Sequence, residues 1–196
     1  MPMHSDFTLY VSAASDLRYE RDLLGRIAAE IPVDLGWRTI LSPTSDGLLD
    51  IGSIQNADIH LMLLGGDVRA PIGQEWILAT QAGRVPIPYL KTGILRTSAA
   101  TDFARFISTR LSWKPFESLG ELRKSVLLDI SSQLIQYAHR YHLRLPDVEN
   151  IQNLQTQLDK TEEAPEENPA PNTDSSSVIL SSKAAATRGG IVIQRD

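Results

Sequence analysis

Short apolar runs alternate with stretches of helical periodicity along the first 143 residues. The apolar runs are rich in β-branched and aromatic residues, and they predict strands over residues 7–11, 33–41, 59–64 and 85–90. The run at 59–64 is interrupted only by His60. Such nearly continuous hydrophobicity is typical of a strand that is buried on both faces of a parallel sheet.

Between these runs, apolar residues recur at helical spacing, with charged residues on the other faces. Helices are predicted over residues 17–31, 48–54, 74–81 and 102–111, and a long amphipathic helix from 118 to about 142. The capping box Ser118-x-x-Glu121 marks the start of the last helix. Gly83 is a natural C-cap for the helix over 74–81.

Strands that alternate with helices predict an α/β fold with right-handed crossovers, in which helices cover both sides of a parallel sheet. We expect a three-layer, flavodoxin-like strand order 2-1-3-4, with a fifth strand left open. Pro86 and Pro88 place the fourth strand near an edge. Ligands of such sheets bind beyond the carboxyl ends of the strands, where the strand order reverses. The loops 12–16 and 65–74 are therefore expected to face each other across a ligand site.

The composition changes along the chain. Residues 152–177 contain few large apolar side chains and an acidic, proline-rich run, so they cannot bury enough apolar area to offset the loss of chain entropy. We expect an α/β domain over 1–143, a disordered linker over 144–177 and a flexible tail over 178–196. The tail turns apolar again, and it is either a frayed end or a peptide that docks onto a partner protein by strand addition.

The 196 residues carry a net charge of −5, which argues against nucleic acid as a partner. The absence of cysteine excludes disulfides, thiolate nucleophiles and cysteine-ligated zinc. No apolar run approaches the roughly 18 residues of a membrane span, and the N-terminus does not resemble a signal peptide. We expect a soluble cytoplasmic protein that contacts neither nucleic acid nor membrane.

No metal or cofactor is expected. His139 and His142 lie three residues apart, but no carboxylate at matching spacing accompanies them. A flavodoxin-like electron carrier would need a phosphate loop rich in Ser and Thr, and the stretch from Ser12 to Ser15 is a poor version of one. The adjacent charged pair Glu20-Arg21 is interpreted as part of a solvated helix face.

Two segments carry a resemblance. The stretch from Leu9 to Arg21 reads LYVSAASDLRYER, and it resembles the opening signature VSSxxxDLxxER of a bacterial domain of unknown function that often begins larger signalling or NTPase chains. The second half agrees, with Ala57-Asp58-Ile59 before a strand, Leu64-Gly65 at its end, and then Glu75, Ala79 and Gly83. This arrangement is similar to the wider group that contains TIR domains and nucleoside 2-deoxyribosyltransferases. The resemblance covers roughly residues 6–110.

The resemblance implies N-glycosidic chemistry, in which a glutamate at the start of the helix after strand three attacks or stabilises the anomeric carbon of a ribosyl group. Glu75 occupies the matching position. A carboxylate suits this role because it can stabilise an oxocarbenium-like transition state or form a covalent intermediate. Relatives place Ser or Thr a few residues before the glutamate, whereas residues 71–74 offer no hydroxyl. Glu75 also has an ordinary explanation, since acids favour the first turn of a helix.

The other candidate ligand-binding residues are Ser12, Ser15, Gly65, Gly66, Asp67, Arg69 and Trp76. The serines and nearby amides could hold a phosphate or simply cap a helix. The glycines could allow a ligand to approach closely or only supply a turn, and the aspartate could accept a bond from a ribose hydroxyl or bond within its own turn. The arginine could meet a phosphate or only water, and the tryptophan could stack on a base or join the core.

Two functional classes follow from these residues. The first is a TIR-like signalling or interaction module of a bacterial multi-protein conflict or regulatory system, which binds a nucleotide-type ligand. Such a module would act together with a protein partner that residues 178–196 contact, or with a second copy of the chain. The alternative is an enzyme that cleaves or transfers the N-glycosidic bond of NAD or a nucleoside, with Glu75 as its catalytic carboxylate. The missing hydroxyl near Glu75 and the detached tail favour the first class.

Overall fold

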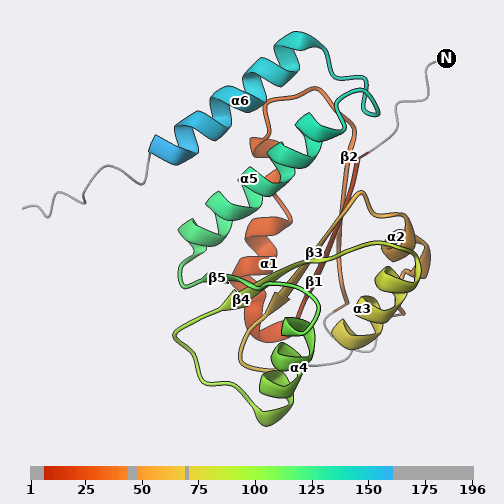
Figure 1. The fold of residues 1–196 in the computed structure, drawn as a ribbon, viewed down its shortest axis with the longest axis vertical. Helices are drawn as coiled ribbons and strands as arrows, with labels where there is room; N and C mark the ends of the chain where they lie inside the picture. Colours follow the sequence, from red (N-terminus) through yellow and green to blue (C-terminus); the bar gives the residue numbers. More distant parts are fainter. Residues whose placement is uncertain (1–6, 44–47, 69–70, 161–196) are drawn as a thin grey trace, which may run out of the picture. The chain divides into compact units, whose positions relative to one another are not determined.

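The computed structural model describes residues 7–43, 48–68 and 71–160. A sheet of five parallel strands forms its centre, in the order β2-β1-β3-β4-β5 (Figure 1). The strands are β1 (Phe7–Ala13), β2 (Trp37–Leu41), β3 (Ile59–Leu64), β4 (Ile87–Lys91) and β5 (Lys114–Phe116). The predicted α/β fold and the order 2-1-3-4 are confirmed, and the fifth strand joins at the β4 edge.

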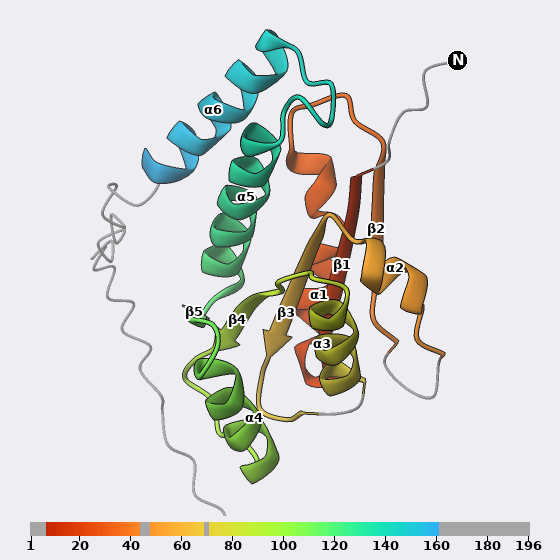
Figure 2. The same cartoon turned by 45° about the vertical axis from the view of Figure 1, so that its right-hand side comes forward.

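Helices cover both faces of the sheet (Figures 1 and 2). One face is covered by α1 (Arg18–Leu24) and α5 (Leu119–Gln136), with α6 (Leu145–Lys160) packed against α5. The other face is covered by α2 (Ile51–Asn56), α3 (Ile72–Gln81) and α4 (Ser98–Ser108). The helix predicted over 17–31 is instead α1 flanked by short 3-10 turns, because the chain leaves the α-helix at Gly25.

Strand alternation decides which side chains reach which layer, because successive residues of a strand point to opposite faces. Leu9 and Val11 of β1 and Leu61 of β3 pack into the core beneath α1 and α5. Tyr10, in contrast, belongs to the core beneath α2 and α3. Tyr10 is paired directly with His60 in the β1–β3 ladder, so both side chains face α2 and α3.

Several local predictions hold in the structure. Ser118 Oγ accepts a hydrogen bond from the backbone N–H of Glu121 at 3.1 Å, as the capping box predicts. Gly83 follows α3 with a φ of 72°, the left-handed conformation that glycine adopts without strain. The strand β5 pairs only with residues 89–91 of β4. Pro88 therefore lies beyond the end of the edge strand, where a missing N–H is tolerated.

The prediction of a disordered linker from residue 144 is wrong for residues 145–160, which form α6. Ile151 and Leu158 of this helix are buried, and they belong to the same core cluster as the buried residues of α5. The segment has a low overall apolar content, but its few apolar residues recur at helical spacing and form a narrow stripe. Such a stripe is enough to stabilise a helix that packs against the protein on one side only. The stripe consists of Val148, Ile151, Leu154 and Leu158. The predicted linker residues 161–177 and the tail 178–196 lie outside the described residues.

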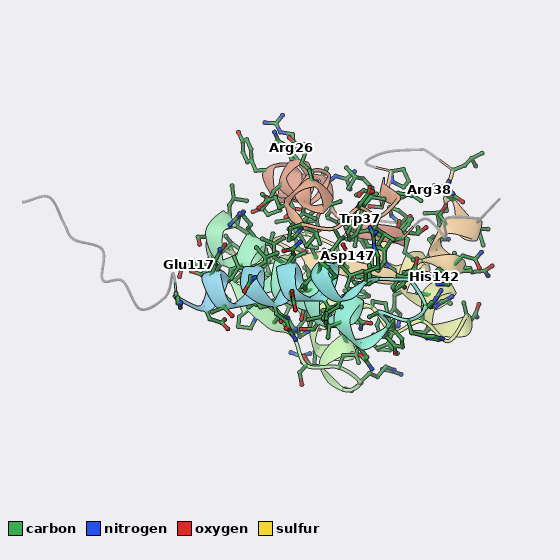
Figure 3. The ribbon with its side chains drawn as sticks, turned by 90° about the horizontal axis from the view of Figure 1, so that it is seen from above. Arg26, Trp37, Arg38, Glu117, His142 and Asp147 are labelled. Atoms are coloured by element: carbon green, nitrogen blue, oxygen red, sulfur yellow. The ribbon has the colours of Figure 1, made fainter. Side chains whose placement is uncertain are left out.

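The long helix predicted to run to about residue 142 ends earlier, because α5 stops at Gln136 and a turn follows. The turn ends at His142, whose φ is 53°, and leads into α6; Figure 3 shows His142 and Asp147 at the start of that helix. Asp58, at the start of β3, fixes the turn by accepting from the Tyr141 hydroxyl at 2.9 Å and pairing with Arg140 at 2.8 Å. No described helix is long and apolar enough to span a bilayer.

Candidate functional site

The loops that follow β1 and β3 meet at one end of the sheet. Asp16 Oδ2, in the loop after β1, accepts a hydrogen bond from the backbone N–H of Gly66 at 2.8 Å. This contact confirms that the two predicted loops face each other. The helix α3 begins after the second loop and lies near the carboxyl ends of β1 and β3, with Glu75 in its first turn (Figure 2).

Glu75 is fully buried against β1. The Tyr10 hydroxyl donates to Glu75 Oε1 at 2.7 Å, whereas Oε2 has no hydrogen-bond partner among the described residues. Burial raises the pKa of Glu75 above its ordinary value; the hydroxyls of Ser12 and Tyr10 and the positive charge of Arg21 oppose the rise. The carboxyl group is therefore an acceptor with one oxygen occupied and one unused.

Ser12 and His60 lie beside Glu75 on the same face of the sheet. Ser12 Oγ and His60 Nε2 are 2.6 Å apart, and both side chains are buried. Burial lowers the pKa of His60 to about 4, so the imidazole is neutral near pH 7. His60 Nδ1 has no hydrogen-bond partner within the part of the chain that the structure describes. Although Ser12 is bonded to a histidine, no described acid is bonded to His60 Nδ1, so the pair lacks the third member of a catalytic triad.

Arg21 closes the cluster on the side of β2. It is buried, and its guanidinium donates to Ala13 O at 2.9 Å, to Ser42 Oγ at 3.1 Å and to Ser42 O at 2.6 Å. These bonds tie together the carboxyl ends of β1 and β2. The prediction that Glu20 and Arg21 lie on a solvated helix face is wrong. Glu20 is also buried, and it pairs with Lys91 at 2.6 Å. The helix α1 thus turns two charged residues inward.

The candidate residues in the loops after β1 and β3 have different structural roles. An added Cβ at Gly65 would collide with the Asp16 carboxylate and with Leu17, and one at Gly66 would lie 2.9 Å from Leu95 O, so both glycines permit the loops to pack closely. Asp67 accepts from the backbone N–H of Val68 at 2.9 Å and from Thr97 Oγ1 at 3.1 Å, bonds that order its own loop. Ser15 is exposed at the start of a 3-10 turn, and Arg69 lies outside the described residues.

Trp76 is adjacent to Glu75 in sequence but belongs to a different cluster. It packs with Met62 and Ile107 beneath α4, whereas the core that contains Tyr10 lies beneath α2 and α3. Trp76 also lines an apolar pocket of about 440 Å³ between α3 and α4, together with Ile77 and Phe106. The structure therefore brings Glu75 and Ser12 together and separates Trp76 from them.

Tyr10, Arg21, Ser42 and His60 complete the cluster, and none of them was a sequence-based site candidate. The period-two alternation of a strand would have placed Tyr10 and Ser12 on one face, which is the signal that was available. No comparable signal joins His60 to Ser12, because their pairing depends on the β1–β3 register. Among the described residues, no group of three or more His, Cys, Asp or Glu side chains is arranged to hold a metal ion.

Comparisons with protein-family models, with curated proteins and with solved structures find no match to this chain. The functional argument therefore rests on the geometry of one cluster, which we call the Glu75 cluster. It consists of Tyr10, Ser12, Arg21, Ser42, His60 and Glu75.

Proposed function

We propose that the chain is a TIR-like signalling or interaction module that binds a nucleotide-type ligand at the Glu75 cluster. The observation that carries the proposal is Oε2 of the fully buried Glu75, which has no hydrogen-bond partner within residues 7–43, 48–68 and 71–160. Buried polar atoms are nearly always bonded, so an unused carboxylate oxygen indicates a place for a donor from outside the chain. Ser12, near the carboxyl end of β1, and Glu75, in the first turn of α3, lie close to the end of the sheet at which parallel sheets bind their ligands.

The chemistry of the cluster favours a ribosyl group as the part of the ligand that Glu75 meets. Glu75 Oε2 is an acceptor, and the vicinal hydroxyls of a ribose are donors. A hydrogen bond between a hydroxyl and a carboxylate is charge-assisted and therefore stronger than a neutral one. Because Glu75 is fully buried, the ligand must displace part of the cover above the carboxylate. Binding would then be coupled to a conformational change, as a sensing module requires.

A second candidate function is cleavage of an N-glycosidic bond, and the buried carboxyl group of Glu75 favours it, because its Oε2 has no hydrogen-bond partner among the described residues. In that reaction Glu75 Oε2 would form a bond to the anomeric carbon while the carbon–nitrogen bond breaks and the base leaves with its electron pair. Water would then hydrolyse the glycosyl ester and release the sugar.

One experiment tests both functions. Wild-type protein, Glu75→Gln and the exposed control Gln81→Ala are titrated calorimetrically with NAD, ADP-ribose and deoxyadenosine, and released base is measured by chromatography. We expect at least one of these compounds to bind wild type and the control equally, and to bind Glu75→Gln at least about tenfold more weakly, a loss of about 1.4 kcal/mol. Base release should be slow at most and absent from Glu75→Gln.

If none of the three compounds binds, or if Glu75→Gln binds as wild type does, the nucleotide-type ligand is refuted. Rapid base release that depends on Glu75 would instead establish the enzyme. Base release that is unchanged in Glu75→Gln would remove this residue from the chemistry.

The expected protein partner remains a part of the proposal. Its support is the sequence of residues 178–196, which turns apolar again after an acidic, proline-rich stretch. A second copy of the chain is the simplest partner to test. Light scattering of the full chain and of a chain that lacks 178–196 would detect self-association and show whether it requires these residues.

A further inference from the structure

The apolar pocket of about 440 Å³ between α3 and α4 includes no member of the Glu75 cluster in its lining. Its volume falls within the range of roughly 300–1,000 Å³ that is typical of small-molecule sites. The lining is almost entirely apolar, and three of its side chains are aromatic. They are Trp76 of α3 and Phe103 and Phe106 of α4. A ligand of this pocket must therefore be apolar over most of its surface.

Gly73, in the first turn of α3, leaves part of the pocket wall without a side chain. It lines the pocket, and a Cβ added to it would meet no atom within 4 Å. Its φ is not positive, so neither the backbone conformation nor a close neighbour requires glycine here. Glycine is also a poor helix former. The fold therefore tolerates a larger residue at this position, and the missing side chain keeps the pocket open.

Two side chains of the lining are incompletely covered. Ile77 of α3 is 51% exposed and Phe106 of α4 is 44% exposed. Removing apolar area of this kind from water is favourable, roughly in proportion to the area covered. A ligand that enters the pocket would cover both side chains, and this gain is available to it without any rearrangement of the core.

A cation lies next to the pocket. Cζ of Arg110 is 4.0 Å from the ring centre of Phe106. Nη1 of Arg110 donates to Phe106 O at 3.3 Å and to Thr109 Oγ1 at 2.9 Å, which leaves Nε and Nη2 for other acceptors. Among the described residues no carboxylate pairs with Arg110, whereas Arg105, on α4, pairs with Asp102 at 3.1 Å. A carboxylate from outside the chain could thus be bound by two parallel N–H groups.

We propose that the pocket between α3 and α4 binds a small aromatic carboxylate, with its rings against the aromatic lining and its carboxylate at the guanidinium of Arg110. Flat rings suit this lining, because offset-stacked and edge-to-face arrangements stabilise aromatic pairs. A nucleobase fits less well, since its polar edge atoms would lose hydrogen bonds to water and find few partners in an apolar pocket. The site is therefore separate from that of the nucleotide-type ligand proposed above.

The first test compares two probes by calorimetric titration of the full-length protein. The probe 2-naphthoate carries two fused rings and a carboxylate, and 2-naphthamide has the same rings without the charge. We expect saturable binding of 2-naphthoate to the wild type, and binding of 2-naphthamide that is weaker by at least about threefold. In Arg110→Gln the two probes should bind equally. Arg105→Gln, a matched loss of charge on α4, should preserve the difference between them.

The second test fills the pocket. Gly73→Leu should weaken the binding of 2-naphthoate by at least about tenfold, because the leucine side chain occupies the open space. Gly120→Leu is the matched control, since Gly120 is also the second residue of a helix, is exposed and does not line the pocket. If Gly73→Leu does not fold, Ile77→Ser replaces it; loss of this half-exposed apolar side chain should weaken binding by at least about fivefold.

Three results would overturn the proposal. The first is an absence of saturable 2-naphthoate binding, and the second is binding that neither Gly73→Leu nor Ile77→Ser weakens. The third is equal affinity of the wild type for the two probes, which would exclude a carboxylate-specific site. If neither probe binds, and light scattering shows a wild-type dimer that Gly73→Leu dissociates, a second copy of the chain occupies the pocket instead. Neither probe has a ribosyl group, so these results are independent of the function proposed for the Glu75 cluster.

Discussion

Replacing Glu75 by glutamine is expected to leave the protein at least as stable as the wild type above neutral pH, although this residue is fully buried. Burial raises the pKa of Glu75, so the ionised carboxylate costs free energy in the folded state that the unfolded chain does not incur. Glutamine keeps the shape of the side chain and the oxygen that accepts from Tyr10, but it carries no charge.

The magnitude follows from the linkage between proton binding and folding. The folded-state pKa lies above the ordinary value of 4.5, so the folded protein holds the Glu75 proton more tightly than the unfolded chain does. As the pH rises from 4.5 through the folded pKa, the wild type loses about 1.4 kcal/mol of stability for each unit of the rise in pKa. The loss persists at higher pH. Below the unfolded pKa both side chains are neutral, and the two proteins should be similar.

Urea unfolding of wild type and Glu75→Gln, measured at intervals between about pH 4 and pH 9, gives the difference in unfolding free energy directly. The difference should grow in favour of the variant as the pH rises and then level off. Glu149→Gln, at an exposed position on α6, serves as the matched control and should stay within about 0.5 kcal/mol of the wild type. A variant that is destabilised by more than about 2 kcal/mol at pH 8, or a difference that does not vary with pH, would refute the reasoning.

Three further stability predictions can be checked by the same unfolding assay. Because Ile151 of α6 is fully buried, Ile151→Ala should lower the unfolding free energy by about 2–5 kcal/mol, whereas the exposed control Asn150→Ala should change it by less than about 0.5 kcal/mol; equal effects would contradict the packing of α6. Burial lowers the pKa of His60 from 6.5 to about 4, so the wild type should lose about 3 kcal/mol as the pH falls through that range, and a His60→Gln variant with the same slope would contradict this assignment. Arg21→Lys should cost about 2–3 kcal/mol because an ammonium cannot reproduce the fork that binds Ala13 O and both Ser42 oxygens; wild-type stability would show that the fork is dispensable.

The sheet could be predicted because its central strands are buried on both faces, which leaves a clear hydrophobic run in the sequence. The run at 59–64 is the strongest case, and all of β3 is buried. The edge strand β5 has only three residues and begins with lysine and proline, so it leaves no such signal. The helix α6 could not be predicted because its apolar residues are few. They become buried only when they pack against the neighbouring helix α5.

The site could be predicted only in part. The rule that parallel sheets bind ligands beyond the carboxyl ends of their strands correctly singled out the loops after β1 and β3, which meet in the structure. The predicted position of Glu75 in the first turn of a helix is also confirmed. Its partners could not be predicted, because Tyr10 and Glu75 lie 65 residues apart and Ser12 and His60 lie 48 apart. These contacts depend on the strand register and on the position of α3, and neither can be inferred from the local sequence. Arg21 was assigned to solvent because a charged residue on a helix usually faces water.

The central claim is that a nucleotide-type ligand binds at the Glu75 cluster, and mapping the bound position of NAD by amide and side-chain chemical-shift changes tests it most directly. We predict saturable shifts that are largest at Tyr10, Ser12 and Glu75 and that are lost in Glu75→Gln. An absence of saturable shifts, or shifts confined to the pocket between α3 and α4, would contradict the account.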